Sequence, residues 1–523
     1  MKRFSIYIAL FFLGCFFTAC SGKDSASVNP DSLTDIPVLS IQTKSTDKNV
    51  MDFVTEPVAT HVAESIASWT PGYEMPPAPY YEPCTVTLTD TDQTVLLDSV
   101  NAEVKVRGNW TTSYDKKPLR IKFEESVNLL GLNDGATFKN WLLLAEYKDA
   151  SMLRNKTALS LASELLAKDG LYVSDAEFVE VIINGQYWGV YLLAEQQQIN
   201  KDRVNITEAA EGYTGTDIGY FMEFDGYYMN EEPLQQFHVD YAENAELIPF
   251  DGKNGDGRTM KCLSDPEFGR KKDIGITIKS DIYSEEQRDF IASFVNNVYN
   301  IMYEAAYQNT AYIFNETYTD IYRTEEISPQ EAVERVVNVN SLADAYLINE
   351  LLCDADVFWS SFFLSADFGP EGDKKLTFNA PWDFDSAMGN KNRCADGTGF
   401  YAANIVPDVN GGPYHGGEYN TINPWLAVLA YEDWYQDIIR SKWTDAYDSG
   451  VFDRAYSTLE ADQARCVEAF SRNYDKWDNI NSSVFAAELS LQSALCRTQV
   501  EAADFLLDWL KSRVEFLNDY WHS

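Results

Sequence analysis

After residue 80 the chain alternates apolar and polar positions with a period of two, the pattern of half-buried β-strands. The alternation runs through residues 85–89, 102–107 and 119–123. Two further β-rich runs, 178–183 and 187–193, are separated by Asn184 and Gly185, a pair that favours a hairpin turn. A helix is expected between these strand groups, at about 150–168, with Gly170 as its end.

From residue 284 the apolar positions recur with a helical period. Ser284 and Gln287 form a capping box ahead of apolar residues on one helical face, and Ser328 before Pro329 predicts a second helix start. Further helices are expected at 341–352, 424–446, 453–475 and 484–519. Because strands dominate 80–283 and helices dominate 284–523, without regular βαβ alternation, the sequence predicts an α+β fold.

The N-terminus has the features of an export signal. Lys2 and Arg3 precede an apolar run that is too short to span a bilayer, and Ala19 precedes Cys20. We expect a signal peptide over 1–19, lipidation at Cys20 and a polar tether over 20–79 that becomes ordered toward its end. The protein would then be exported and lipid-anchored in a bacterial cell envelope, facing the periplasm or the cell surface. An ordinary signal peptide with an incidental cysteine is the alternative, and Cys15 is a competing site.

Composition narrows the chemistry. The 81 Asp+Glu against 41 Lys+Arg give a net charge of −40, which a nucleic-acid backbone would repel, so we expect no nucleic-acid partner. The chain has four histidines and neither an HExxH nor a GxSxG motif, which argues against zinc peptidases and α/β-hydrolases. Any catalysis is therefore expected to rest on carboxylates. No CxxC pair occurs, and disulfides and isolated buried thiols both remain open.

Basic residues gather on the predicted strands. Lys105 and Arg107 share one face of the strand at 102–107, and Arg120 and Lys122 share one face of the strand at 119–123. If these strands are neighbours, they form a cationic face suited to a phosphate group. The alternative is a solvated outer face whose cations pair with local acids.

Carboxylates gather in the helical part. Asp356 follows the helix at 341–352, and Asp383 and Asp385 flank Phe384. On an extended segment the latter two would point to one side, and oxygen ligands so placed favour Mg²⁺, Mn²⁺ or Ca²⁺. The alternative is that they are aspartates of helix caps and turns.

A cationic face and a metal-binding carboxylate pair are the two halves of a phosphoryl-transfer site. The absence of GxGxxG and Walker motifs excludes an ordinary kinase or P-loop enzyme.

Six blocks occur in the order found in one known family. They are Arg107-Gly108-Asn109-Trp110, the stretches 116–122, 140–145, 153–156 and 184–195, and Pro381-Trp382-Asp383-Phe384-Asp385. Over roughly residues 100–390 the chain thereby resembles the CotH kinase family of secreted atypical kinases. The resemblance implies an atypical protein-kinase-like fold, with a β-rich N-terminal lobe over 80–283 and a helical C-terminal lobe over 284–523.

The resemblance also implies chemistry: ATP with Mg²⁺ (or Mn²⁺) as cofactors, and Ser or Thr of envelope or secreted proteins as acceptors. Asp356 looks like the catalytic aspartate that accepts the hydroxyl proton. Asp383 looks like the metal-binding aspartate of the DFG-type segment, and Asp385 is a possible second ligand.

For the nucleotide, the resemblance implies that Lys122, supported by Arg107 and Lys117, holds phosphates. Glu195 would fall near the adenine edge. Glu164, on the helix after the lysine strand, is predicted to be the ion-pair partner that positions the lysine.

One position departs from the family pattern. Ser361 stands where the family commonly has a metal-binding asparagine, and a hydroxyl is a poorer Mg²⁺ ligand than a carboxamide. A second reading therefore stays open, in which the chain is a catalytically inactive CotH-like surface lipoprotein that acts in adhesion or in binding glycan or protein. The oligomeric state is left open.

Overall fold

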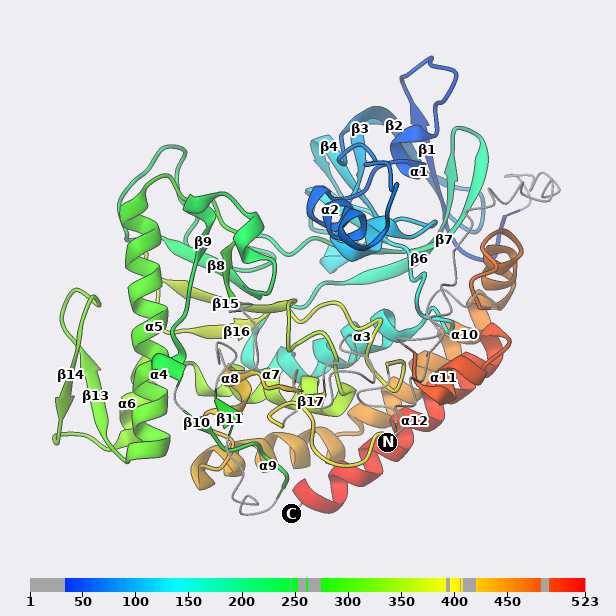
Figure 1. Cartoon of the computed structure of the whole chain (residues 1–523). Coiled ribbons are helices and arrows are strands. Elements are labelled where there is room, and N and C mark those ends of the chain that lie inside the picture. The colour runs from blue at the N-terminus through cyan, green and yellow to red at the C-terminus, as the bar shows by residue number, and fades with distance from the viewer. Residues whose placement is uncertain are drawn as a thin grey trace, which may run out of the picture.

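We describe the fold from a computed structural model, which describes residues 33–244, 246–252, 260–261, 274–391, 396–404, 406–407, 420–480 and 489–522. The predicted signal peptide and the predicted lipidation site Cys20 lie outside the described residues. The described part contains both helices and sheets as separate blocks, which confirms the α+β class (Figure 1).

A closed seven-stranded barrel forms the first block, in the strand order β1-β2-β3-β4-β5-β7-β6 (Figure 1). Its neighbours are antiparallel except β1 and β6, which pair in parallel and close the barrel. The strands are β1 (Val38–Thr43), β2 (Glu82–Thr89), β3 (Val95–Val106), β4 (Leu119–Val127), β5 (Phe138–Leu144), β6 (Ala176–Ile183) and β7 (Gln186–Glu195). Alternate residues of these strands, such as Val104, Ile121 and Val181, fill the interior of the barrel.

The β-patterns at 85–89, 102–107 and 119–123 are confirmed as parts of β2, β3 and β4. The hairpin is confirmed too. Asn184 and Gly185 both have positive φ, 51° and 76°, as the tight turn between β6 and β7 requires.

The segment predicted as a tether is folded over part of its length. Leu39 and Ile41 of β1 are buried in the barrel core, and residues further on form the helices α1 (Asp52–Thr55) and α2 (Thr60–Trp69). The ordered part of the predicted tether thus begins at β1, because a short apolar alternation inside a polar stretch supplies the strand that closes the barrel.

A second, five-stranded sheet has the order β16-β15-β8-β12-β9. Its strands are β8 (Gly219–Asp225), β9 (Gln236–Phe237), β12 (Gly275–Ile278), β15 (Phe362–Asp367) and β16 (Thr377–Asn379). Since β8 pairs with β15, this sheet joins residues from both sides of the boundary that the sequence placed at 283. Pairing over such a separation leaves no local signal in the sequence.

Helices pack below the barrel and beside the second sheet (Figure 1). They are α3 (Arg154–Leu166), α4 (Tyr241–Asn244), α5 (Glu285–Gln308), α6 (Pro329–Val336), α7 (Val339–Leu352), α8 (Pro424–Ala427), α9 (Asp433–Asp448), α10 (Val451–Lys476), α11 (Leu491–Leu495) and α12 (Gln499–Trp521). The capping box of Ser284 and Gln287 is confirmed at the start of α5. The helix expected over 484–519 is interrupted, because Thr498 caps α12 with its own capping box.

Small two-stranded pairs complete the architecture: β10 (Glu246–Leu247) with β11 (Met260–Lys261), β13 (Ala311–Phe314) with β14 (Ile321–Thr324), and β17 (Val406–Pro407) with β18 (Asn420–Thr421). Across the described helices, none combines the length and the apolar character that a bilayer span requires. Within the same residues Cys84, Cys353, Cys466 and Cys496 are free thiols.

Candidate functional site

A cleft of about 1530 Å³ separates the barrel from the second sheet and the helices. The barrel contributes the end of β3, β4 and β5, and the opposite side contributes β8, β15 and the loops that follow α7 and β16. The cleft is larger than the roughly 300–1,000 Å³ of a typical small-molecule pocket, so it has room for a ligand and a second reactant.

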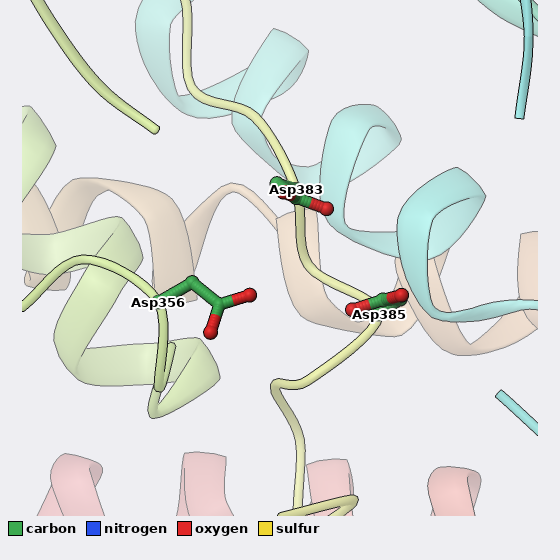
Figure 2. A group of neighbouring side chains, drawn as sticks. All are labelled: Asp356, Asp383 and Asp385. Carbon is green, nitrogen blue, oxygen red and sulfur yellow. The ribbon is translucent and has the colours of Figure 1, made fainter. Parts of the chain in front are cut away.

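Three aspartates meet in the cleft: Asp356, Asp383 and Asp385, here called the aspartate cluster. One carboxylate oxygen from each lies within 4.8 Å of the other two. Figure 2 shows the three side chains converging from two separate loops. Three hard oxygen donors at this separation fit a divalent cation such as Mg²⁺ or Mn²⁺.

Asp356 is placed by the end of α7. The helix stops at Cys353, which adopts a left-handed conformation with φ 47°, and the chain then turns into the cleft. The carboxylate of Asp354 accepts a hydrogen bond from the Asp356 backbone N–H at 3.0 Å. The Lys391 ammonium lies 3.1 Å from Oδ1 of Asp356 and forms an ion pair with it.

The segment that carries Asp383 and Asp385 is not a strand. Asp383 has φ 71°, in the left-handed region, so the extended geometry predicted for this pair is wrong. The two carboxylates reach one site because the backbone turns between them. Asn155 holds this turn by accepting a hydrogen bond from the Phe384 backbone N–H at 2.7 Å.

Asp385 has its own cation. The Lys148 ammonium, from the loop after β5, lies 3.3 Å from Asp385 Oδ1, and both side chains are largely buried. The Ser386 hydroxyl donates to the same oxygen at 3.0 Å. Lys148 and Lys391 thus partly neutralise the aspartate cluster from two sides.

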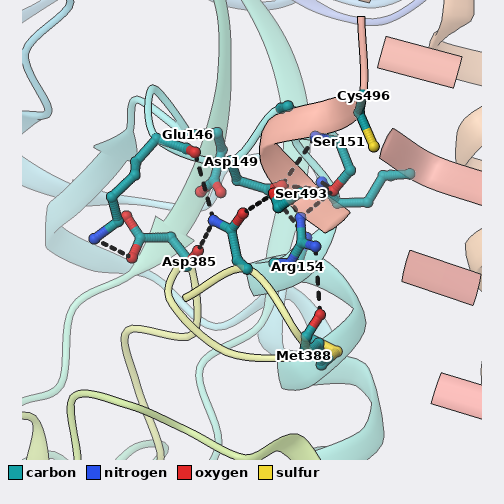
Figure 3. Close-up of polar contacts among 12 residues, drawn as sticks. Glu146, Asp149, Ser151, Arg154, Asp385, Met388, Ser493 and Cys496 are labelled. Atoms are coloured by element: carbon teal, nitrogen blue, oxygen red, sulfur yellow. Dashed lines mark hydrogen bonds and ion pairs between the residues drawn. The ribbon is translucent and has the colours of Figure 1, made fainter. Parts of the chain in front are cut away.

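A buried arginine anchors the loop that follows the cluster. Arg154 forms an ion pair with Asp149 and donates to the backbone carbonyls of Ala387 at 3.1 Å and Met388 at 3.3 Å (Figure 3). Arg154 is completely buried. The first turn of α3 therefore fixes the loop from both its start, through Asn155, and its end.

The concentration of acids shifts their protonation. Burial, followed by repulsion from Asp385 and Asp356, raises the pKa of Asp383 to about 7, although Lys148 and Arg107 act in the opposite direction. Burial and then the charge of Asp356 raise the pKa of Asp354 well above its usual range. A cation bound in the cluster would reverse this effect by favouring the ionised carboxylates.

Three of the four residues predicted for the cationic face line the cleft. Lys105 and Arg120 pair across β3 and β4 and line the cleft together with Arg107. Lys122 is exposed and lies outside the lining, opposite Glu103. The prediction that Lys122 holds phosphates in the cleft is therefore wrong. Lys122 lies on the predicted face of β4, but only the end of β4 that carries Arg120 reaches the cleft.

Lys117 is also corrected. It is buried, and its ammonium donates to the backbone carbonyl of Thr112 in the short helix η2 (Trp110–Ser113). Burial lowers the pKa of Lys117 to about 8.

A glycine follows Arg107 at the end of β3. Gly108 has a φ of 97°, and a side chain at this position would collide with the Thr111 hydroxyl. The glycine therefore shapes the turn by which the chain leaves β3.

The two predicted glutamates lie away from the aspartate cluster. Glu164 forms an ion pair with Arg454 of α10 on the surface, so its predicted role as the partner of the strand lysine is corrected. Glu195 is fully buried in an ion pair with Arg203 at 3.0 Å and accepts from Asn133. Arg454 is 290 residues from Glu164 in the sequence, so no local pattern could indicate that pair. Arg203 is only eight residues from Glu195, but it lies after the end of β7, where no strand or helix period predicts which side chains meet.

Ser361 does lie beside the cluster. Its hydroxyl donates to Asp383 Oδ2 at 3.3 Å, and its backbone N–H donates to Glu223 of β8 at 2.9 Å. Glu223 is also ion-paired with Lys279 at 2.7 Å. The hydroxyl thus contacts Asp383, a predicted metal ligand.

Sequence reasoning missed several residues of the cleft. Lys148 and Lys391 belong to no recognisable motif in the sequence, although Lys148 lies four residues after the end of β5. Gln196 and Gln197 follow β7 and line the cleft, and each has a buried side-chain amide atom without a hydrogen-bond partner. The only feature of the sequence that could have indicated these two glutamines is their position directly after the predicted strand that became β7.

Comparisons with known proteins show which family the chain resembles in sequence. The family model described as CotH kinase protein matches residues 104–517. Inner spore coat protein H of Bacillus subtilis (strain 168) is 34% identical over 96 residues, which cover 18% of this chain and 24% of that protein. The chain therefore matches about a quarter of the length of this relative.

Proposed function

Because the chain belongs to the CotH kinase family, we propose that it transfers the γ-phosphoryl group of ATP to Ser or Thr hydroxyls of envelope or secreted proteins. The observation that carries the proposal is the aspartate cluster, which faces Lys105, Arg107 and Arg120 across one cleft. Phosphoryl transfer needs cations for the phosphates and carboxylates for a metal ion and for the acceptor.

The residues present fit Mg²⁺ or Mn²⁺. Asp383 and Asp385 would hold the ion, with the Ser361 hydroxyl beside Asp383 as a weaker oxygen donor. When bound, the ion neutralises charge on the phosphates during transfer. The ion pair with Lys148 orients the Asp385 carboxylate toward the other two aspartates of the cluster.

The nucleotide is proposed to bind against the barrel, which would serve as the N-terminal lobe of a kinase-like fold. Arg107, Lys105 and Arg120 would hold its phosphates. The adenine edge offers one donor and one acceptor, and it would bind to Gln196 Oε1 and Gln197 Nε2, which have no hydrogen-bond partner. These two glutamines take the place first predicted for Glu195.

Asp356 is proposed to accept the proton of the acceptor hydroxyl. Its ion pair with Lys391 orients the carboxylate and places a positive charge where the transferred group becomes more negative. We also propose that the signal peptide directs export and that Cys20 is lipidated. The cleft would then meet its acceptors outside the cytoplasm.

A non-catalytic surface module that binds glycan or protein is the second candidate. Trp69 is 59% exposed, and its ring lies 6.0 Å from that of Trp110 at the edge of the cleft. Tyr and Trp are enriched at binding interfaces, where an apolar ring with a polar atom is useful. Ser361, in place of asparagine, is compatible with this candidate.

Nucleotide binding separates the two candidates. ATP with Mg²⁺ at about 100 times its Kd is expected to stabilise the protein by about 2.7 kcal/mol and so raise its Tm. Asp383→Ala is expected to abolish the shift, whereas Glu164→Ala, at the surface pair with Arg454, should keep it. Differential scanning fluorimetry measures both, and a wild type that shows no shift contradicts the kinase proposal.

The same shift should depend on pH. The pKa of Asp383 is about 7 without a metal, so below pH 7 the proton competes with Mg²⁺ for this carboxylate. We expect the Mg²⁺-ATP shift to be smaller at pH 6 than at pH 8. A shift that is larger at pH 6 would show that Asp383 does not hold the ion in its charged form.

A further inference from the structure

A buried chain of hydrogen bonds runs from the first turn of α3 to the backbone between Asp383 and Asp385. The amide nitrogen of Asn155 donates to both carboxylate oxygens of Glu146, at 3.0 and 3.1 Å. The amide oxygen of Asn155 accepts from the Phe384 N–H at 2.7 Å. Asn155 is 5% exposed and Glu146 is 4% exposed, so water competes little for these bonds.

The orientation of the Asn155 amide is determined by its partners. A backbone N–H can only donate, so the amide oxygen has to face Phe384. The amide nitrogen then has to face Glu146, whose carboxylate oxygens are acceptors. Glu146 thereby selects the orientation in which Asn155 can hold the Phe384 N–H.

The bond to Phe384 acts on the two proposed metal ligands at once. Phe384 is the single residue between Asp383 and Asp385, and Asp383 is in the left-handed region that non-glycine residues rarely adopt. Such a conformation persists where its surroundings fix it. Asn155 supplies that fixation from a helix, which is a rigid support.

We propose that Asn155 is a positioning residue, oriented by Glu146, that sets the separation and direction of the Asp383 and Asp385 carboxylates for a divalent cation. The inference rests on the proposed function, because it concerns the metal ion of that site. In this role Glu146 and Asn155 act on the metal ligands, and neither residue needs to contact the nucleotide or the acceptor. Partners behind metal ligands commonly change metal affinity by about 10- to 100-fold.

The test is Mn²⁺ binding to the full protein, measured by electron paramagnetic resonance at a temperature where every variant is folded. Asn155→Leu is expected to weaken Mn²⁺ binding at least about tenfold. Glu146→Gln keeps an oxygen acceptor for Asn155 and should bind Mn²⁺ nearly as the wild type does. Glu146→Leu removes the acceptor and should weaken binding. Thr157→Val, a buried change further along α3, is the matched control and should leave binding unchanged.

The outcomes separate the inference from the function on which it rests. Wild-type Mn²⁺ binding that Asn155→Leu retains overturns the positioning role alone. Equal binding by Glu146→Gln and Glu146→Leu overturns the part assigned to Glu146. A loss of affinity in Thr157→Val as large as that in Asn155→Leu shows a general effect on the helix and also overturns the inference. A wild type that binds no Mn²⁺ contradicts the proposed function itself, and the inference with it.

Discussion

Replacing Asp356 with asparagine is expected to slow phosphoryl transfer by about 10²- to 10⁴-fold, the usual contribution of a positioned general base. Asparagine has nearly the shape of aspartate but cannot take up the acceptor proton, and the substitution removes the ion pair with Lys391. The amide oxygen still faces the cluster, so Mg²⁺-ATP should continue to raise the Tm. Turnover with labelled ATP and thermal shift, measured on the same preparation, check both statements.

Lys391→Met provides the control for Asp356. It removes the cation and keeps the carboxylate, so it should reduce transfer less than Asp356→Asn does. Unchanged transfer in Asp356→Asn would move the role of the base to another residue.

The second large effect concerns stability. Arg513 of α12 and Glu350 of α7 form an ion pair in which both side chains are fully buried. Arg513 also donates to the backbone carbonyls of Glu350, Gly397 and Gly399. Arg513→Ala leaves the Glu350 carboxylate buried without its cation, and we expect a loss of about 3–5 kcal/mol in the free energy of unfolding. Urea denaturation measures it.

A second substitution tests the reason for that loss. If the buried charge is the cause, Glu350→Gln in the Arg513→Ala background should recover part of the stability, because the amide is neutral. Its single oxygen can still accept from one of the two backbone N–H groups, of Tyr401 and Ala402, that donate to the two carboxylate oxygens of Glu350. A double variant that is less stable than the single variant would point instead to lost packing. Since α7 ends just before Asp356, Arg513→Ala should also lower Mg²⁺-ATP binding.

The elements that the sequence predicted well are those with local signals. The hairpin at Asn184 and Gly185 and the capping box at Ser284 depend on neighbouring residues alone, and both are confirmed. The pairing of β8 with β15 depends on contacts between distant segments. No local pattern near either strand indicates this pairing, so the sequence-based boundary at 283 does not take it into account.

The candidate site shows the same division. The residues Asp356, Asp383 and Asp385 were selected from the sequence, and they meet in one cluster. The geometry assigned to the last two was wrong, because the left-handed turn at Asp383 depends on Asn155, far away in the chain. The cations that line the cleft are harder to predict. Strand alternation indicates which face of the sheet a side chain lies on, but not how far along the strand the cleft extends. Lys105 and Arg120 reach the cleft while Lys122, on the same face, does not.

The central claim is phosphoryl transfer from ATP, and the position of the transferred label tests it most directly. The purified protein would be incubated with Mg²⁺ and with ATP labelled either at the α- or at the γ-phosphorus, together with exported proteins as acceptors. We expect label from the γ-position on Ser or Thr, and none from the α-position. Label from the α-position would show nucleotidyl transfer, and no label from either position would support the binding module; each result would contradict the kinase account.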